Sequence, residues 1–203
     1  MNKKKLCISL ILIICICLSI LLSWFLFYRP FNVEEAYIRI EPVRSAEEFD
    51  MMKDYINRNS TDGSYQIFCN TDEFPSKSYE DYCYVLIHFA VKNHSLINVS
   101  VNDGYVTNAE STDFIMFKRP IAFETTLSSL EFKMSEDCYD FLCYRGDLSD
   151  EEIIDKFKEL QINMLYETSF LNSLNYKYDL SKSIYVSSYE EFDEIRNEIK
   201  AKQ

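Results

Sequence analysis

The sequence predicts an α+β protein in which a single N-terminal transmembrane helix is followed by one β-rich domain, an antiparallel sandwich or a curved sheet. Three observations support this prediction: an uncharged apolar run near the N-terminus, a series of short alternating segments separated by turn residues, and two to three amphipathic helices that begin with capping residues. The expected organisation is a basic stub over 1–5, an anchor over 6–28 and one domain over 31–203.

The anchor is predicted from a run of 23 residues, 6–28, that contains no charged side chain. As a helix that rises about 1.5 Å per residue, this run spans roughly 35 Å, which exceeds the ~30 Å hydrocarbon core of a membrane. The run ends in bulky aromatic residues instead of the small residues of a signal-peptide cleavage site. We therefore expect an uncleaved anchor, with a cleaved signal peptide as the alternative.

The orientation of the chain follows from the charges beside this run. Lys3, Lys4 and Lys5 precede it. Positively charged residues next to a transmembrane helix remain preferentially on the cytoplasmic side. We therefore expect a single-pass protein of the cell membrane whose N-terminus is cytoplasmic and whose residues 31–203 are extracytoplasmic.

The expected extracytoplasmic domain is strongly acidic. It holds 17 of the 21 basic residues and all 33 acidic residues, so its formal charge is −16. Such a charge repels phosphate backbones, and nucleic acid is therefore not an expected partner. The expected partners are the membrane, through the anchor, and a basic protein. The alternative is that the acidic surface only keeps the domain soluble.

Four cysteines lie in the expected domain: Cys69, Cys83, Cys138 and Cys143. In an oxidising compartment this even number allows two disulfides in three possible pairings. Cys69 and Cys83 end and begin consecutive strand-like segments, and we expect this pair to form a disulfide. Cys138 and Cys143 are expected on opposite faces of one strand. The alternative is four unpaired, buried thiols.

The strongest strand prediction is 82–93, with the sequence YCYVLIHFAVKN. It is apolar on both faces, which is typical of a central strand or of a strand covered by a helix. After it, Asp103-Gly104 is expected to form a tight hairpin turn. In the strand expected at 130–134, Leu130, Phe132 and Met134 are expected to face inward. Further strands are expected at 37–40, 65–69, 97–101, 114–118, 120–125, 130–134, 139–144, 162–166 and 184–186.

Three helices are expected in the domain, at 45–59, 149–160 and 188–199. Each begins with a serine followed three residues later by glutamate, which is the spacing of a capping box. Each then places its apolar residues at helical spacing on one face.

The sequence contains no catalytic motif, and we expect neither a cofactor nor a metal site. Its only histidines are His88 and His94. His88 lies within the strongest strand, where a hydrogen-bonded structural role is expected, with a Ser–His or Cys–His pair as the alternative. No phosphate-binding glycine loop or zinc motif is present.

The candidate interaction residues are Tyr79, Tyr82 and Tyr84, which are crowded in one short segment. Aromatic side chains so close together are a candidate surface for a protein partner or for sugar rings. The alternative is a compositional preference for aromatic residues throughout the chain.

The expected function is binding without catalysis. A small acidic domain on a single anchor suits the neutralisation or docking of a basic exported protein, as in an immunity protein or a surface adaptor. The alternative is a receptor for a small ligand or glycan, or an enzyme whose site is assembled from scattered residues.

Overall fold

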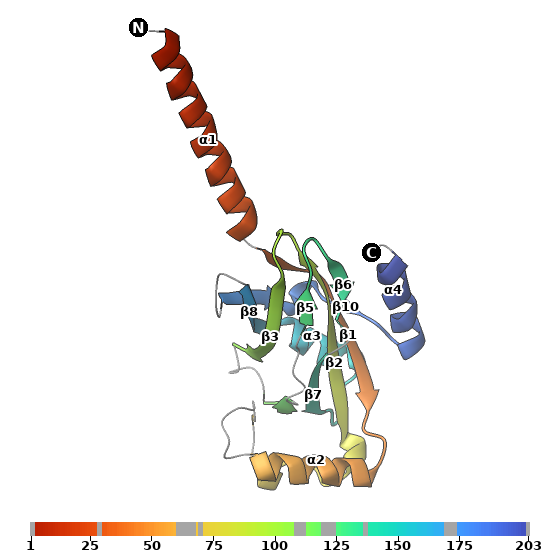
Figure 1. Ribbon diagram of the computed structural model, residues 1–203. Helices are drawn as coiled ribbons and strands as arrows, with labels where there is room; N and C mark the ends of the chain where they lie inside the picture. Colours follow the sequence, from red (N-terminus) through yellow and green to blue (C-terminus); the bar gives the residue numbers. More distant parts are fainter. Residues whose placement is uncertain are drawn as a thin grey trace.

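A computed structural model describes residues 3–27, 30–59, 68, 71–107, 113–118, 125–135, 138–168 and 174–201, with side chains omitted at 3–8, 24–27, 59 and 103. It contains four α-helices and two β-sheets among these residues (Figure 1). The α+β class and the sandwich-like arrangement of strands are therefore confirmed.

The larger sheet contains the strongest predicted strand at its centre. Its order is β10 (Ile184–Tyr185), β1 (Phe31–Pro42), β2 (Tyr82–Asn93), β7 (Tyr139–Tyr144) and β4 (Ile115–Lys118), with β6 (Phe132–Met134) also paired to β2. All pairs are antiparallel except β1 and β10, which are parallel. The smaller sheet is antiparallel, in the order β5 (Thr125–Leu127), β3 (Val99–Val106), β8 (Gln161–Thr168) and β9 (Leu174–Asp179).

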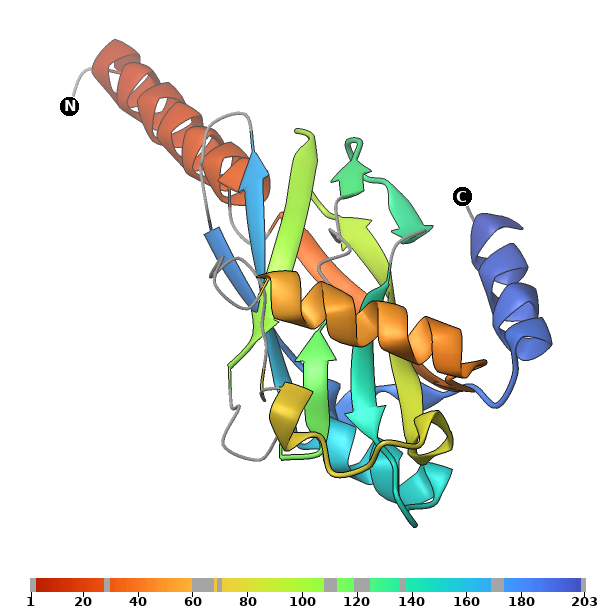
Figure 2. The same cartoon turned by 90° about the horizontal axis from the view of Figure 1, so that it is seen from below.

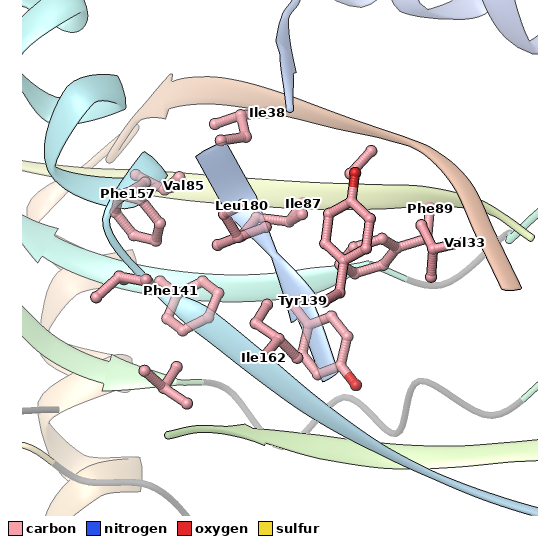
Figure 3. Packing of buried hydrophobic residues seen from close by; sticks show 14 of the residues in the cluster. Val33, Ile38, Val85, Ile87, Phe89, Tyr139, Phe141, Phe157, Ile162 and Leu180 are labelled. Carbon is pink, nitrogen blue, oxygen red and sulfur yellow. The ribbon is translucent and has the colours of Figure 1, made fainter. Parts of the chain in front are cut away.

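The main hydrophobic core lies between the two sheets. One face of β2 contributes Cys83, Val85, Ile87, Phe89 and Val91 to it, as the alternation of the sequence predicts. Strands β3 and β8 close this core from the other sheet. Figure 3 shows part of this packing, including Ile162 and Phe141.

Three helices pack on this sandwich. Two of them, α2 (Ala46–Asn59) and α4 (Tyr189–Ala201), cover the outer face of the larger sheet, which explains why β2 is apolar on both sides. In Figure 2, α2 crosses the strands of this sheet. The third, α3 (Asp150–Lys158), contributes Ile153, Ile154 and Phe157 to the core between the sheets.

The predicted capping residues begin all three of these helices. The hydroxyl of Ser149 accepts a hydrogen bond from the Glu152 N–H, and the Glu152 carboxylate accepts from the Ser149 N–H in return. In α2 and α4 the serine contact is the same, but the glutamate accepts from the residue that precedes the serine. At each of these three N-termini, side chains of nearby residues therefore accept hydrogen bonds from backbone N–H groups that have no partner within the helix.

The N-terminal helix, α1 (Lys3–Phe27), has exposed side chains throughout 9–23, where they are described. None of the helices in the described part of the chain is both long enough and apolar enough to cross a membrane. The transmembrane helix expected at 6–28 is not supported by this finding and stays a prediction.

The structure corrects two expectations about turns. Asp103-Gly104 is not a hairpin turn, because β3 continues through it with a shift of register against β8 between Asn102 and Gly104. A bulge at glycine lets the backbone of β8 approach closely. Leu130 does not face inward: it is 53% exposed and has a φ of 59°, because it lies in the turn before β6.

The strand β9 was not expected. It is an edge strand of the smaller sheet, and of its six residues one, Tyr178, is buried. The strand expected at 65–69 has only residue 68 within the described residues, and of the one expected at 120–125 only Thr125 is described, in β5.

Candidate functional site

A polar groove of about 650 Å³ lies between α2 and the segment 71–77, which begins with the short helix η1 (Thr71–Glu73). Its lining combines acidic, basic, neutral polar and aromatic side chains. They are Asp50, Lys53, Asp54 and Asn57 of α2 and Thr71, Asp72, Phe74, Ser76 and Lys77 of the segment.

The α2 wall of the groove is the polar face of an amphipathic helix. The four α2 residues are spaced at i, i+3, i+4 and i+7, so they share one face, while Phe49, Met52 and Ile56 are buried on the other. The Lys53 ammonium lies 2.7 Å from the Asp50 carboxylate and 4.7 Å from the centre of the Phe49 ring. The helix packing thus fixes which polar groups face the groove.

The opposite wall is held by side-chain hydrogen bonds. The Thr71 hydroxyl donates to the side-chain oxygen of Asn57. The Tyr82 hydroxyl donates to the Ser76 carbonyl oxygen at 2.7 Å and accepts from the Ser76 N–H at 3.1 Å. A buried strand residue therefore fixes the position of the segment.

Behind the groove, three aromatic rings pack together. The Tyr82 ring lies 4.6 Å from that of Phe49 and 5.6 Å from that of Phe74, measured between centroids. Phe74 is half-buried and also lines the groove, so its ring joins the aromatic cluster to the polar site. The aromatic part of the groove lining, Phe74, is therefore supported by ring packing against Phe49 and Tyr82.

The three tyrosines singled out in the sequence differ in exposure. Tyr82 and Tyr84 are buried, at 1% and 6% exposure, because they face the layer of α2. Tyr79 is half-buried at the edge of the same cluster, in the short helix η2 (Tyr79–Asp81). They do not form a shared exposed platform, and a role of Tyr79 in binding stays a prediction.

Of the two cysteines expected to pair, Cys69 lies outside the described residues, and that pairing stays a prediction. Cys83 is buried between the sheets as a free thiol. Burial raises its pKa to about 12. Cys138 is half-buried on the outer side of the sheet, whereas Cys143 faces the core, so the two lie on opposite faces as expected. They do not share one strand, because β7 begins at Tyr139, directly after Cys138.

His88 is buried beneath α4. Within the described residues neither of its ring nitrogens has a hydrogen-bond partner. Burial, and then the charges of Arg39 and Arg196, lower its pKa to about 3, so the ring is neutral near pH 7. The structure places no hydroxyl or thiol of the described residues in a hydrogen bond with it, as a Ser–His or Cys–His pair requires.

The chemistry available in the groove is polar recognition. Its carboxylates accept hydrogen bonds from ammonium, guanidinium or hydroxyl groups, and its lysines donate to anionic or hydroxyl oxygens. In the part of the chain that the structure describes, no group of three or more His, Cys, Asp or Glu side chains is arranged to hold a metal ion.

Sequence reasoning missed the groove because its two walls come from separate segments whose contact depends on the tertiary fold. The polar face of α2 was the one signal in the sequence, and it also fits an ordinary solvated helix. Comparison of the chain with protein-family models, curated proteins and solved structures gave no match.

Proposed function

We propose that this protein is a single-pass membrane-anchored binding domain whose extracytoplasmic part, 31–203, docks or neutralises a basic exported protein. The charge of the domain is the observation that carries this proposal. Its formal charge is −16, and α2, α3 and α4 each hold at least two more acidic than basic residues. Such a field attracts a basic partner and accelerates its encounter at low salt.

The groove is the proposed binding site for this basic partner. Strand β1 starts four residues after α1 ends, and it ends four residues before α2 begins. A 12-residue strand spans roughly 40 Å, so α2 lies at the end of the domain away from α1 (Figure 1). The groove, which α2 lines, lies at the same end. A partner outside the membrane would meet this end of the domain first.

The anchor in this proposal is the uncharged run 6–28. It is supported by the three lysines before it and by the absence of contacts that bury the side chains of 9–23. Membranes from producing cells should retain the full chain after alkaline carbonate washing, and protease added outside should degrade the domain. A chain recovered in the carbonate supernatant would refute the anchor.

The binding proposal is tested with the full chain in detergent micelles as bait, against secreted and membrane fractions of the producing organism. The expected result is one basic protein that is retained at low salt and released at high salt, and whose purified form binds directly. Retention of no protein at either salt would refute the proposal.

A matched pair of variants tests the groove as the docking site. Asp50→Asn, Asp54→Asn and Asp72→Asn together remove three charges from the groove. Glu190→Gln, Glu194→Gln and Glu198→Gln remove three charges from α4, where these side chains are also exposed. We expect the first set to weaken binding at least 10-fold more than the second, since it removes direct contacts. Equal losses would show that only net charge matters.

A second candidate function is glycan binding, which the lining of the groove favours. Carboxylate, amide and hydroxyl groups beside a half-buried aromatic ring suit the hydroxyls and apolar face of a sugar, and about 650 Å³ accommodates a small ligand. Calorimetric titration with oligosaccharides of the producing organism's surface tests it. Binding lost in Phe74→Ala but not in Tyr79→Ala would support it.

A further inference from the structure

Two buried cysteines lie opposite each other on neighbouring strands of the larger sheet. Cys83 in β2 and Cys143 in β7 are directly opposite partners in the antiparallel register. Both are 0% exposed, and both side chains belong to the core between the sheets. They therefore lie on the same face of the sheet as well as at the same height along it.

This arrangement meets the geometric demands of a disulfide. Opposite residues of antiparallel strands have Cα atoms about 4.5–5.5 Å apart, and disulfides join Cα atoms that are about 4.4–6.8 Å apart. Neither strand would need to shift for a bond between the two sulfur atoms to form. Cys138 does not share this position, because it packs on the outer side of the sheet.

We propose that Cys83 and Cys143 form a cross-strand disulfide when the chain folds in an oxidising compartment. The occurrence of this bond in cells depends on the extracytoplasmic location proposed above. It replaces the expected Cys69–Cys83 pairing, since one sulfur forms one such bond. The disulfide would fasten the start of β2 to the end of β7, next to the turn that leads into α3.

The reaction converts two thiols into one disulfide and releases two protons and two electrons. The electrons reduce the disulfide of a thiol oxidoreductase, or of oxidised glutathione, to two thiols. The thiolate of one cysteine attacks the disulfide of this oxidant, which forms a mixed disulfide and releases one of the oxidant's sulfurs as a thiolate. The thiolate of the second cysteine then attacks the sulfur of the first and displaces the oxidant's other thiolate, and the two released thiolates take up the two protons.

The folded state determines when this reaction occurs. Burial raises the pKa of Cys83 to about 12 and that of Cys143 well above its ordinary value. Because the thiolate is the reactive form, both groups react slowly once the sheets have closed. The disulfide therefore forms during folding, while the strands are still open to the oxidant.

Peptide mapping of the full chain tests the pairing. The chain is synthesised in a cell-free reaction with detergent micelles and oxidised glutathione, alkylated, denatured and digested with trypsin without reduction. The tryptic peptides 59–77, 78–92 and 134–145 contain Cys69, Cys83 and the Cys138 and Cys143 pair, respectively. We expect 78–92 to be joined to 134–145, and the link to be lost in Cys143→Ser but kept in Cys138→Ser.

Three results would overturn the proposal. They are an alkylated, unlinked 78–92 peptide, a link from 78–92 to 59–77, and a link that survives in Cys143→Ser but not in Cys138→Ser. A further measurement does not depend on the single variants. Reductant should lower the Tm of the oxidised wild type by roughly 5–15 °C, because it releases a closed loop. The double variant Cys83→Ala/Cys143→Ala should not respond to reductant.

The same peptide mapping, applied to chain recovered from producing cells, tests the cysteine pairing and the proposed location independently. A chain that forms the link in the cell-free reaction but is recovered reduced from producing cells would refute the oxidising, extracytoplasmic location. The pairing itself would stand. Failure of the link in the cell-free reaction would refute the pairing and would leave the location to the fractionation experiment.

Discussion

The ring of Phe192 in α4 packs against the imidazole of His88 in β2, with centroids 4.1 Å apart and the ring planes tilted by 34°. The guanidinium of Arg39 lies 5.7 Å from the same Phe192 ring. An aromatic residue of α4 thus covers two basic groups of the larger sheet, His88 and Arg39, both of which are buried. This contact joins α4 to the sheet through both apolar packing and a cation–π interaction.

The buried His88 makes stability depend on pH. In the unfolded chain its imidazole binds a proton near pH 6.5, whereas in the folded chain it does so only near pH 3. The unfolded state therefore gains protons first as the pH falls, and stability decreases between pH 6.5 and 3 by about 1.4 kcal/mol per pH unit from this group.

Urea unfolding of the wild type and of His88→Phe between pH 7 and 4.5 measures this effect. We expect the variant to lose less stability than the wild type below pH 6.5, since phenylalanine cannot bind a proton. Parallel pH profiles would show that His88 is not the responsible group.

Phe192→Ala is expected to lower the free energy of unfolding by about 3–5 kcal/mol, because the ring is 3% exposed and fills the space between α4 and the sheet. Tyr189→Ala is the matched control on the same helix, at a position that is 52% exposed, and should cost much less. Chemical denaturation checks both variants. Equal losses would contradict the packing of α4 described above.

Gly104→Ala is expected to destabilise the domain by about 1–3 kcal/mol. A Cβ atom at this position would lie 2.5 Å from the Tyr139 hydroxyl oxygen and 2.7 Å from the Asn163 carbonyl oxygen, so one strand would have to move. Thermal unfolding, with Ser100→Ala in the same strand as the control, measures the cost. A loss no larger than that of the control would contradict the close approach of β3 to β8.

Leu130→Asn is expected to stabilise the protein by about 0.5–1 kcal/mol. Leu130 has a φ of 59°, a conformation that leucine adopts at a cost and asparagine more readily, and its side chain is 53% exposed. The neighbouring Ser129→Asn serves as the control and should have little effect. A loss of stability in Leu130→Asn, seen as a lower urea midpoint, would contradict the strain at this residue.

Local patterns of the sequence predicted much of this fold. The alternation of 82–93 identified both faces of β2, and each Ser-x-x-Glu motif identified the start of a helix, because these signals depend on neighbouring residues. Gly104 was misread because the same Asp-Gly pair serves a hairpin turn or a bulge, and only the partner strand decides between them.

The groove and the cysteine pair depend on contacts between distant segments. The register of β2 against β7 decides that Cys83 faces Cys143, and no local pattern contains that register. Tyr82 was likewise a candidate surface residue in the sequence, but in the structure it is buried against Ser76 and Phe49. The acidic character of the domain, in contrast, follows from composition alone and needs no knowledge of contacts between distant segments.

The parallel pairing of β1 with β10 joins the first strand of the domain to a strand that the ribosome synthesises near the end of the chain. Tyr37 is paired opposite Ile184, so this edge of β1 has no partner strand until the C-terminal part of the chain has been synthesised. Until residue 184 has been synthesised, β1 has one open edge, and the face later covered by Phe192 is bare. A chain whose translation stops before residue 184 would keep both the unpaired edge of β1 and the uncovered apolar face. Such a chain would be a ready substrate for quality-control proteases.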